Sequence, residues 1–216
     1  MGMWAKRIVH LNENFAAISR RDRVFLNNPV VMNGVGLAPL VIAATTGRNA
    51  LMLSVAVLLM ITPTRVLSAL VCRWVKFRAL VYCLSAAVVY IGAYYCMQAW
   101  FSVEVTYLGM YLPLLVVEPI VIRRYEQPAP EKISSALKKG LLNTGGYVLV
   151  ILLVGMLREL LAQGALFGQP LFDWSILPLS QLAAGGFIVV GVLCALWRGA
   201  VNLVKKRVNM EAKKYQ

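Results

Sequence analysis

Few side chains in this sequence could do chemistry, and the most unusual of them is a single carboxylate. Glu118 stands beside Pro119 in the apolar run PLLVVEPIVIRR. A carboxylate buried in apolar surroundings holds its proton more tightly than one in water, so Glu118 is a candidate site for a proton or a cation. Alternatively, Glu118 lies at the edge of the apolar run and pairs with Arg123 or Arg124.

A second candidate group is the pair Arg158 and Glu159, which follows a long apolar stretch. Adjacent residues of a helix point about 100° apart, so we expect one of the two to face a helix bundle and the other to meet the membrane interface. Arg48 follows an earlier apolar stretch and is a candidate partner for Glu159. Together with Glu118, these three residues are our candidates for an ion pathway. Alternatively, they form a charge cluster that fixes helix ends.

The sequence contains few residues that could support other kinds of catalysis. Its one histidine, His10, lies near the N-terminus, and no HExxH, GxSxG or Gly-rich nucleotide-binding motif occurs. The four cysteines are far apart and lack the CxxC spacing of metal sites, namely Cys72, Cys83, Cys96 and Cys194. We therefore predict no catalytic residue and no metal ligand in this chain.

The composition indicates what kind of fold must position these side chains. Of 216 residues, 60% are hydrophobic and only 14% are charged, and the mean hydropathy is +0.70. Soluble domains are about half apolar and a quarter charged. The composition excludes a disordered chain, a coiled coil and a disulfide-rich scaffold, and it is unlike that of a soluble enzyme. It favours an all-α polytopic membrane protein.

Six apolar segments can be marked, and each is a predicted transmembrane helix. A helix needs about 20 apolar residues to cross the hydrocarbon core of a bilayer. The predicted segments are 29–46, 50–70, 80–101, 105–122, 141–161 and 177–197. We expect a basic N-terminal segment over 1–28, either an interfacial helix or an ordinary tail, one membrane domain over 29–200, and a basic tail over 201–216.

The distribution of charge predicts the orientation in the membrane. The chain has 22 Lys and Arg against 9 Asp and Glu, for a net charge of +13. With six crossings, all the basic residues except Arg48 and Arg158 fall on the side of the two termini. Basic loops stay in the cytoplasm, so both termini are predicted to be cytoplasmic. The basic residues form short runs between apolar segments, which argues against a nucleic-acid partner.

Two of the six segments are interrupted by glycine and proline in a similar way. GLAPLV at 36–41 and MYLPLLV at 110–116 align on Pro39 and Pro113. They begin two sets of three segments, 29–101 and 105–200, which would be inverted repeats in the bilayer. We predict that helices 1 and 4 are broken at Pro39 and Pro113, with Gly36 and Pro119 also at the breaks, and that the two breaks meet near the midplane.

These motifs, and several others, are similar to those of a known family. The matching elements are NPV at 28–30, GLAPL at 36–40, NAL at 49–51, LGMYLPLLVV at 108–117, LRE at 157–159 and GALFG at 164–168. In order and spacing the chain resembles the membrane subunits of the Rnf and sodium-pumping Nqr complexes. Those complexes move electrons from ferredoxin or NADH and couple this to transport of Na⁺ or H⁺. A cytoplasmic N-terminus looks like the RnfE/NqrD type.

The resemblance implies a partner and a cofactor, and this sequence departs from the family at the cofactor. In the family, an RnfA/NqrE-like subunit pairs with the RnfE/NqrD-like one, and a cysteine in each broken helix holds a [2Fe–2S] cluster between them. The corresponding positions here are Ala38 and Pro119. A methyl group and a pyrrolidine ring cannot bind iron, so we expect this chain to bind no cluster by itself.

The predicted function follows from the resemblance. We expect an integral membrane subunit of an ion-translocating electron-transport complex in the bacterial cytoplasmic (inner) membrane. It would act as a scaffold and as part of the mid-membrane electron and ion gate, surrounded by lipid and by other Rnf/Nqr-type subunits. It would be at most a subunit of a translocase, and not catalytic alone. Two alternatives stay open: a small six-helix transporter or solute-binding component that uses the broken helices, and a paralogue that only organises a complex.

Overall fold

The computed structural model describes residues 14–15, 19, 22–75, 77–102, 105–108, 111–115, 132–172 and 174–214. The fold is mostly helical. Its elements are α2 (Pro29–Asn33), α3 (Leu37–Ala43), α4 (Gly47–Val71), α5 (Arg78–Phe101), α6 (Val105–Leu108), α7 (Tyr111–Leu114), α9 (Ile133–Gln163), β1 (Ala165–Leu166), β2 (Gln169–Pro170), the 3₁₀ helix η2 (Pro178–Gln181) and α10 (Ala183–Lys213).

Within the described residues, four helices are long and apolar enough to cross a membrane: α4, α5, α9 and α10. They coincide with four of the predicted segments, so a polytopic helical membrane protein is confirmed. The predicted segments 29–46 and 105–122 take another form. Each contains two short helices, α2 and α3 in the first and α6 and α7 in the second, while residues 116–122 lie outside the described part of the chain.

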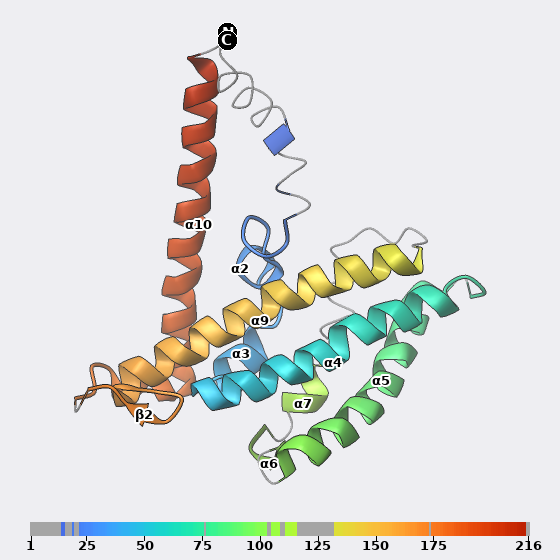
Figure 1. The fold of residues 1–216 in the computed structure, drawn as a ribbon, viewed down its shortest axis with the longest axis horizontal. Coiled ribbons are helices and arrows are strands. Elements are labelled where there is room, and N and C mark those ends of the chain that lie inside the picture. Colours follow the sequence, from blue (N-terminus) through green and yellow to red (C-terminus); the bar gives the residue numbers. More distant parts are fainter. Residues whose placement is uncertain are drawn as a thin grey trace.

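The helices α4 and α9 form the central pair of the fold (Figure 1). They run antiparallel, because Thr62 lies opposite Thr144, with 2.9 Å between their Oγ1 atoms, while Ala50 lies opposite Gly155. A Cβ at Gly155 would lie 2.4 Å from the Cβ of Ala50. A small residue at this position therefore lets the two backbones approach closely, as is common between helices in lipid.

Buried aliphatic side chains fill the space between these helices. From α4 and α9 they include Leu53, Val57, Val150, Ile151 and Val154. α3 adds Leu40 and Val41 to the same cluster. The shorter helices of the first segment therefore belong to the core of the protein, and α5 packs on α4.

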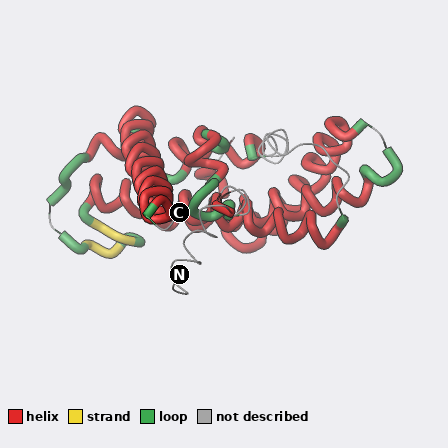
Figure 2. The backbone as a smooth tube through the Cα atoms, turned by 90° about the horizontal axis from the view of Figure 1, so that it is seen from above, coloured by secondary structure: helices red, strands yellow, loops and turns green. Residues whose placement is uncertain are grey.

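The last helix, α10, is attached to the rest of the fold mainly through its N-terminal half. It contacts η2, α3, α2 and α9, and it crosses α9 at a steep angle (Figures 1 and 2). Most of its apolar side chains are exposed, including Phe187, Ile188, Val192 and Leu196. Exposed apolar side chains on such a helix fit contact with lipid or with another membrane protein.

Candidate functional site at the broken first span

The first apolar segment is interrupted where two glycines adopt the left-handed conformation. α2 ends at Asn33, Gly34 and Gly36 have φ values of 68° and 74°, and α3 begins at Leu37. Only glycine adopts this conformation without steric cost. The prediction placed the break at Pro39, but Pro39 is the third residue of α3, where a missing N–H costs no helical hydrogen bond. The glycines therefore interrupt this span, and the proline does not.

Tyr147 of α9 fills the space beside this break. Its hydroxyl donates to the carbonyl oxygen of Gly36 at 3.0 Å, and its side chain is fully buried. A Cβ at Gly36 would lie 1.6 Å from the Tyr147 oxygen. The glycine is needed twice, for its backbone conformation and for the approach of the ring, and the Tyr147 hydroxyl is a second donor to a carbonyl that also accepts from the N–H of Leu40 at 3.3 Å.

Arg158 of α9 binds the C-terminal end of α3. Its side chain is fully buried. One terminal nitrogen, Nη1, donates to the carbonyl oxygen of Val41 and, at 3.0 Å, to that of Ala44. The last carbonyls of a helix lack partners within the helix and carry partial negative charge. The Arg158 guanidinium therefore donates hydrogen bonds to these carbonyls and also balances their partial negative charge.

The rest of the same guanidinium binds the segment that leads into α10. Nε donates to the carbonyl oxygen of Ser180 at 2.8 Å, and Nη2 donates to those of Gln181 at 3.0 Å and Leu182 at 3.4 Å. The Ser180 hydroxyl returns a hydrogen bond of 3.1 Å to the carbonyl oxygen of Arg158. An arginine has five N–H donors, and here each of them meets a backbone carbonyl.

Glu159 binds the opposite kind of backbone group. Its Oε2 accepts from the N–H of Gly47, the first residue of α4, at 2.7 Å, and from the N–H of Phe167 at 3.1 Å. Its Oε1 accepts from the N–H of Gly168 at 2.7 Å. Phe167 and Gly168 form the turn between β1 and β2, with φ values of 52° and 79°. A carboxylate at a helix N-terminus stabilises the partial positive charge there.

We call Tyr147, Arg158 and Glu159 the α9 clamp, because all three reach from α9 to the junctions of the broken span. We expected one of the two charged neighbours to face the bundle and the other to meet the membrane interface, and in the described fold both side chains are buried. The predicted partner of Glu159, Arg48, is exposed at the second position of α4. The donors to Glu159 within the described chain are backbone N–H groups.

The first half of the broken span, α2, is fixed at its N-terminus by Asn28. The Asn28 Oδ1 atom accepts from the N–H groups of Val30 at 2.9 Å and Val31 at 3.3 Å, as an N-cap does. Its Nδ2 atom donates to the carbonyl oxygen of Gly146 in α9 at 2.8 Å. This fully buried side chain thus caps one helix and ties it to another.

The C-terminal end of α2 is bound by Arg198 of α10. Its Nε donates to the carbonyl oxygen of Val31 at 3.0 Å, and Nη2 donates to that of Met32 at 2.8 Å. Beside it, the Trp197 indole donates to the carbonyl oxygen of Phe25 at 2.9 Å and stacks on its ring. The C-terminal carbonyls of each half of the broken span are therefore bound by an arginine. Arg198 binds those of α2, and Arg158 binds those of α3.

The second interrupted segment shows a partly similar arrangement. Pro113 is the third residue of α7, as Pro39 is the third residue of α3, and these two short helices are in contact. Glu118 and Pro119 lie outside the described residues. Ala38, where the resemblance implies a cysteine in the family, is exposed in the first turn of α3.

At Ala38, the described one of the two positions that the resemblance assigns to cluster ligands, the side chain does not fit an iron–sulfur cluster. Ala38 offers a methyl group, and no group of three or more His, Cys, Asp or Glu that could hold a metal ion occurs in the described ranges. The four cysteines are free thiols on α10, on α5 and at the end of α4.

The site contains residues that were not among the predicted candidates, namely Tyr147, Asn28, Ser180 and Arg198. Asn28 could have been found from the Asn-Pro pair, since asparagine followed by proline is a typical helix N-cap and first position. No sequence signal identifies Tyr147, because a tyrosine in an apolar helix is common. The Ser180 backbone contact depends on tertiary structure alone.

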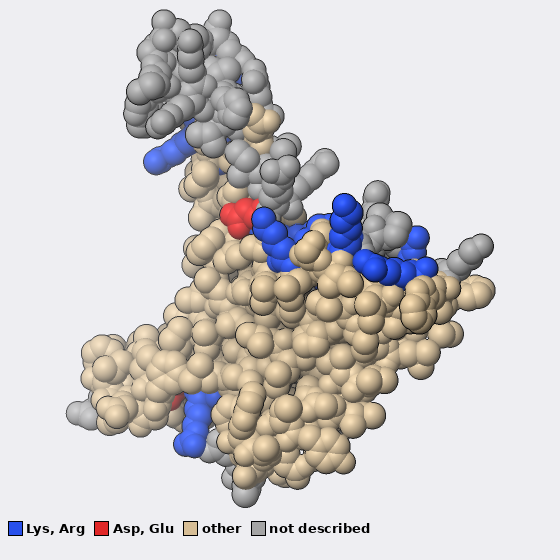
Figure 3. All heavy atoms as spheres, turned by 45° about the vertical axis from the view of Figure 1, so that its right-hand side comes forward, with Lys and Arg blue, Asp and Glu red and all other residues tan. Residues whose placement is uncertain are grey.

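The charged surface of the protein is uneven. Lys and Arg side chains gather along one edge of the described surface (Figure 3). Arg73, Arg78, Lys132 and Lys138 lie at or near the ends of α4, α5 and α9 that are far from Glu159. Arg158 and Glu159 of the α9 clamp lie near the other end of the α4–α9 pair, where the exposed Arg48 also lies.

Comparison with known proteins gives a consistent result. A profile of the family described as "Rnf-Nqr subunit, membrane protein" matches residues 19–194. The E subunit of the ion-translocating oxidoreductase complex of Pseudomonas aeruginosa is 31% identical over 93% of this chain and 91% of its own length. The protein of the same name from Shewanella oneidensis is 34% identical over 84% of each chain.

A third relative comes from another kind of bacterium. The E subunit of the proton-translocating ferredoxin:NAD(+) oxidoreductase complex of Clostridium ljungdahlii is 31% identical over 78% of this chain and 82% of its own length. The family profile covers the broken span, the α9 clamp and most of the membrane helices. With a helical membrane architecture and a family profile over most of its length, the chain belongs to the Rnf-Nqr family of membrane subunits.

Proposed function

We propose that this protein is the E-type membrane subunit of an ion-translocating electron-transport complex, in which it serves as a scaffold and as part of the gate at mid-membrane. The observation that carries the proposal is the broken first span, in which the buried side chains of Asn28 and Arg158 bind the N-terminal end of α2 and the C-terminal end of α3. Backbone that leaves a helix at membrane depth requires such partners or a polar cavity. The names of the relatives favour a complex subunit over a free-standing solute transporter.

The proposed topology has six crossings in the bacterial cytoplasmic membrane, with both termini in the cytoplasm. In this arrangement α2 and α3 form one interrupted crossing, and α6, α7 and the residues after them form the second. The contact between α3 and α7 supports a pairing of the two interrupted segments. The basic edge in Figure 3 supports the orientation, since it joins the loop ends assigned to the cytoplasm.

The proposed role of the chain is to hold the interrupted spans, while the redox centres belong to other subunits. The partner would be an RnfA/NqrE-like subunit, which would face the exposed Ala38 side of α3. A cluster bound by this chain is not part of the proposal, because Ala38 provides no thiolate. Glu118 is the proposed proton or cation site of the second interrupted segment.

The proposal is tested in membrane vesicles from the native host. A strain lacking this chain is complemented with the wild type, with Glu118→Gln and, as a control at an exposed basic position, with Arg73→Gln. Electron donors are reduced ferredoxin and NADH, and the readouts are electron transfer and uptake of Na⁺ or H⁺. We expect the deletion to abolish ion uptake, Glu118→Gln to lower the ions moved per electron, and Arg73→Gln to behave as wild type.

Two results would overturn parts of this proposal. If ion uptake is unchanged in the deletion strain, the chain is not a subunit of the ion-translocating complex. A stoichiometric iron–sulfur cluster in the chain purified without its partners would contradict the assignment of the redox centres to other subunits. Purification of the tagged chain from native membranes, followed by mass spectrometry, identifies the partner subunits directly.

A further inference from the structure

The segment that joins α9 to α10 is apolar in sequence and on its surface. Between Glu159 and Arg198 the sequence has a single charged residue, Asp173, which lies outside the described residues. We call residues 164–182 the α9–α10 connection. Among its described side chains, the large apolar ones that are 50% exposed or more are Leu171, Phe172, Trp174, Ile176, Leu179 and Leu182. Loops that face water are normally polar, so this surface indicates another environment.

The α9–α10 connection folds back along the end of α9 instead of extending away from it. The turn between β1 and β2 is bound to Glu159 through backbone N–H groups, and Ser180 is bound to Arg158. Glu159 and Arg158 precede Gln163, the last residue of α9, by four and five positions, or about 6–8 Å along the helix axis. The connection therefore returns to a level before the end of α9.

The depth of that level follows from the length of α9. The exposed Lys138 precedes the apolar run of α9, and Arg158 is twenty residues, or about 30 Å, further along the axis. The hydrocarbon core of a bilayer is about 30 Å thick, and lysines near helix ends reach its edge. With Lys138 at one edge, Arg158 lies at the other edge or deeper, since a tilted helix needs more residues to cross. The contacts with Arg158 and Glu159 thus hold the connection at the boundary of the hydrocarbon core.

The backbone of the connection has hydrogen-bond partners within the protein. The N–H groups of Leu171 and Phe172 both donate to the carbonyl oxygen of Gly164, at 2.8 and 3.0 Å, and the N–H of Leu177 donates to that of Leu161 at 2.7 Å. Irregular backbone near membrane depth requires such partners, because lipid offers none. These bonds fit a place with little water.

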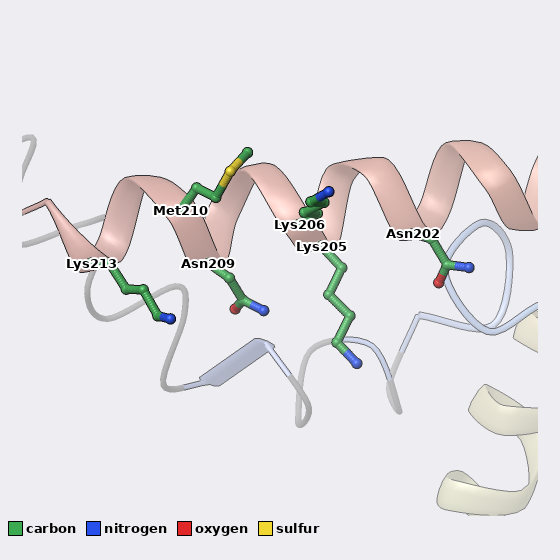
Figure 4. A pocket seen from close by; sticks show the side chains of 6 residues that line it. All are labelled: Asn202, Lys205, Lys206, Asn209, Met210 and Lys213. Carbon is green, nitrogen blue, oxygen red and sulfur yellow. The ribbon is translucent and has the colours of Figure 1, made fainter.

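The apolar surface of the connection continues into α10. Phe187 and Ile188 in the first turns of α10 are exposed, and residues 183–197 include no charged side chain. The basic side chains of α10 gather at its other end, where Lys205 and Lys213 lie (Figure 4). The connection is therefore at the end of α10 opposite its basic part. In the orientation proposed above, this end meets the outer leaflet.

We propose that the α9–α10 connection is embedded in the outer leaflet of the bilayer, at the boundary between lipid headgroups and acyl chains, where its exposed apolar side chains contact lipid. The rings of Phe172 and Trp174 pack edge to face with their centroids 6.3 Å apart, and tryptophan is enriched at this level of a membrane. The inference does not depend on the redox function of the complex. Only the choice of leaflet rests on the proposed topology.

The test measures the depth of single spin labels in the full chain, reconstituted into vesicles of phosphatidylcholine and phosphatidylglycerol. The four free cysteines are first replaced by alanine. Labels are then attached to Phe172→Cys, Ile176→Cys and Leu179→Cys. Ile188→Cys on α10 is the lipid-exposed reference, and Arg73→Cys is the control at a basic exposed position. Collisions with oxygen, which concentrates in lipid, and with a water-soluble nickel complex give the depth of each label.

We expect the three labels of the connection to lie about 5–10 Å below the lipid phosphates, the usual depth of an interfacial segment. The label at Arg73→Cys should lie in water. Nickel collisions as frequent at the connection as at Arg73→Cys would place the connection in water and overturn the proposal. Depth does not depend on electron transfer or on the orientation of the chain, so this failure is distinguishable from a failure of the proposed function.

A second measurement needs no cysteine. The difference in fluorescence between the wild type and Trp174→Phe reports on Trp174, and phenylalanine keeps the side chain apolar. We expect phospholipids brominated near the headgroup end of the acyl chain to quench this difference more strongly than iodide in the water. The opposite order would overturn the proposal. Unfolding midpoints equal to that of the wild type verify that the variants are folded.

Photocrosslinking in native membranes distinguishes lipid from a protein partner. A benzophenone amino acid replaces Trp174 in the tagged chain, and the adducts formed under light are identified by mass spectrometry. We expect adducts with phospholipid. An adduct with another protein in most of the crosslinked chain would show that a neighbouring subunit covers the connection, and it would overturn the assignment to lipid.

Discussion

Arg158 and Glu159 are adjacent in sequence, yet they bind opposite ends of two successive helices. Arg158 donates to the carbonyl end of α3, and Glu159 accepts from the first N–H of α4. The partial charges of a helix are negative at its C-terminus and positive at its N-terminus. One pair of neighbouring side chains therefore matches both charges where the chain passes from α3 to α4.

Replacement of Arg158 is expected to cost more stability than replacement of any exposed basic residue. Arg158→Met leaves buried carbonyls of α3 and η2 without their donor, and each such loss costs about 1–3 kcal/mol. We expect a loss of at least about 3 kcal/mol. Arg158→Lys should be intermediate, because lysine keeps the charge but lacks the planar fork.

The measurement is thermal and denaturant unfolding of the full chain in detergent. Arg73→Gln, at an exposed position on the same protein, serves as the control and should change stability little. An Arg158→Met variant as stable as wild type would show that the contacts of the guanidinium are energetically neutral.

Glu159 should tolerate glutamine better than alanine. Glutamine keeps one acceptor for the N–H of Gly47 or of the β1–β2 turn, whereas alanine leaves all of them unpaired. We expect Glu159→Ala to lose about 2–4 kcal/mol and Glu159→Gln about half of that. Limited proteolysis should cut the β1–β2 turn faster in Glu159→Ala. Equal cleavage rates in wild type and both variants would contradict a role of the carboxylate in holding the turn.

Two adjacent glycines of α9 provide a test of close packing. A Cβ at Gly146 would lie 2.4 Å from the carbonyl oxygen of Arg23, whereas a Cβ at Gly145 would meet no described atom within 4 Å. Gly146→Ala should therefore destabilise the protein by about 1–3 kcal/mol. Gly145→Ala should leave stability unchanged or raise it by up to about 1 kcal/mol, because alanine favours a helix. Unfolding midpoints of the two variants give the comparison, and equal effects would contradict it.

Two threonines of α4 differ in their hydrogen bonding. Thr62 shares a hydrogen bond with Thr144, while the buried hydroxyl of Thr64 has no partner among the described residues. Thr62→Val should cost about 1 kcal/mol, since it leaves Thr144 unpaired, and Thr62→Val with Thr144→Val should recover part of that loss. Thr64→Val should be neutral or stabilising. If Thr64→Val costs as much as Thr62→Val in unfolding experiments, the Thr64 hydroxyl has a partner in solution.

The long helices could be predicted from the sequence because a bilayer requires long apolar segments. Residues 50–70, 80–101 and 141–161 lie within α4, α5 and α9, and 177–197 overlaps α10. The break of the first span was predicted in the correct segment and with Gly36 among its residues, but it was centred on Pro39, whereas the structure places it at Gly34 and Gly36. Proline is a visible helix breaker in any sequence, whereas the left-handed conformation of Gly34 and Gly36 depends on the packing of Tyr147 against the chain.

The candidate site was only partly predictable. Arg158 and Glu159 were identified because charges in an apolar sequence are costly, but their partners were not, since these are backbone groups and leave no trace in side-chain chemistry. The motifs that carried the family resemblance converge at this place. NPV contains the cap Asn28, LRE contains the two charged residues, and GALFG contains the turn that Glu159 binds.

The contacts of Arg158 also impose an order on the making of the protein. Three of its five acceptors belong to residues 180–182, which leave the ribosome some twenty residues after the arginine itself. Until residues 180–182 have been synthesised, the guanidinium can bind only the α3 carbonyls and water. The segment that leads into α10 therefore completes the binding of Arg158. A chain that stops before Ser180 would leave part of this cation without hydrogen-bond acceptors in the lipid bilayer.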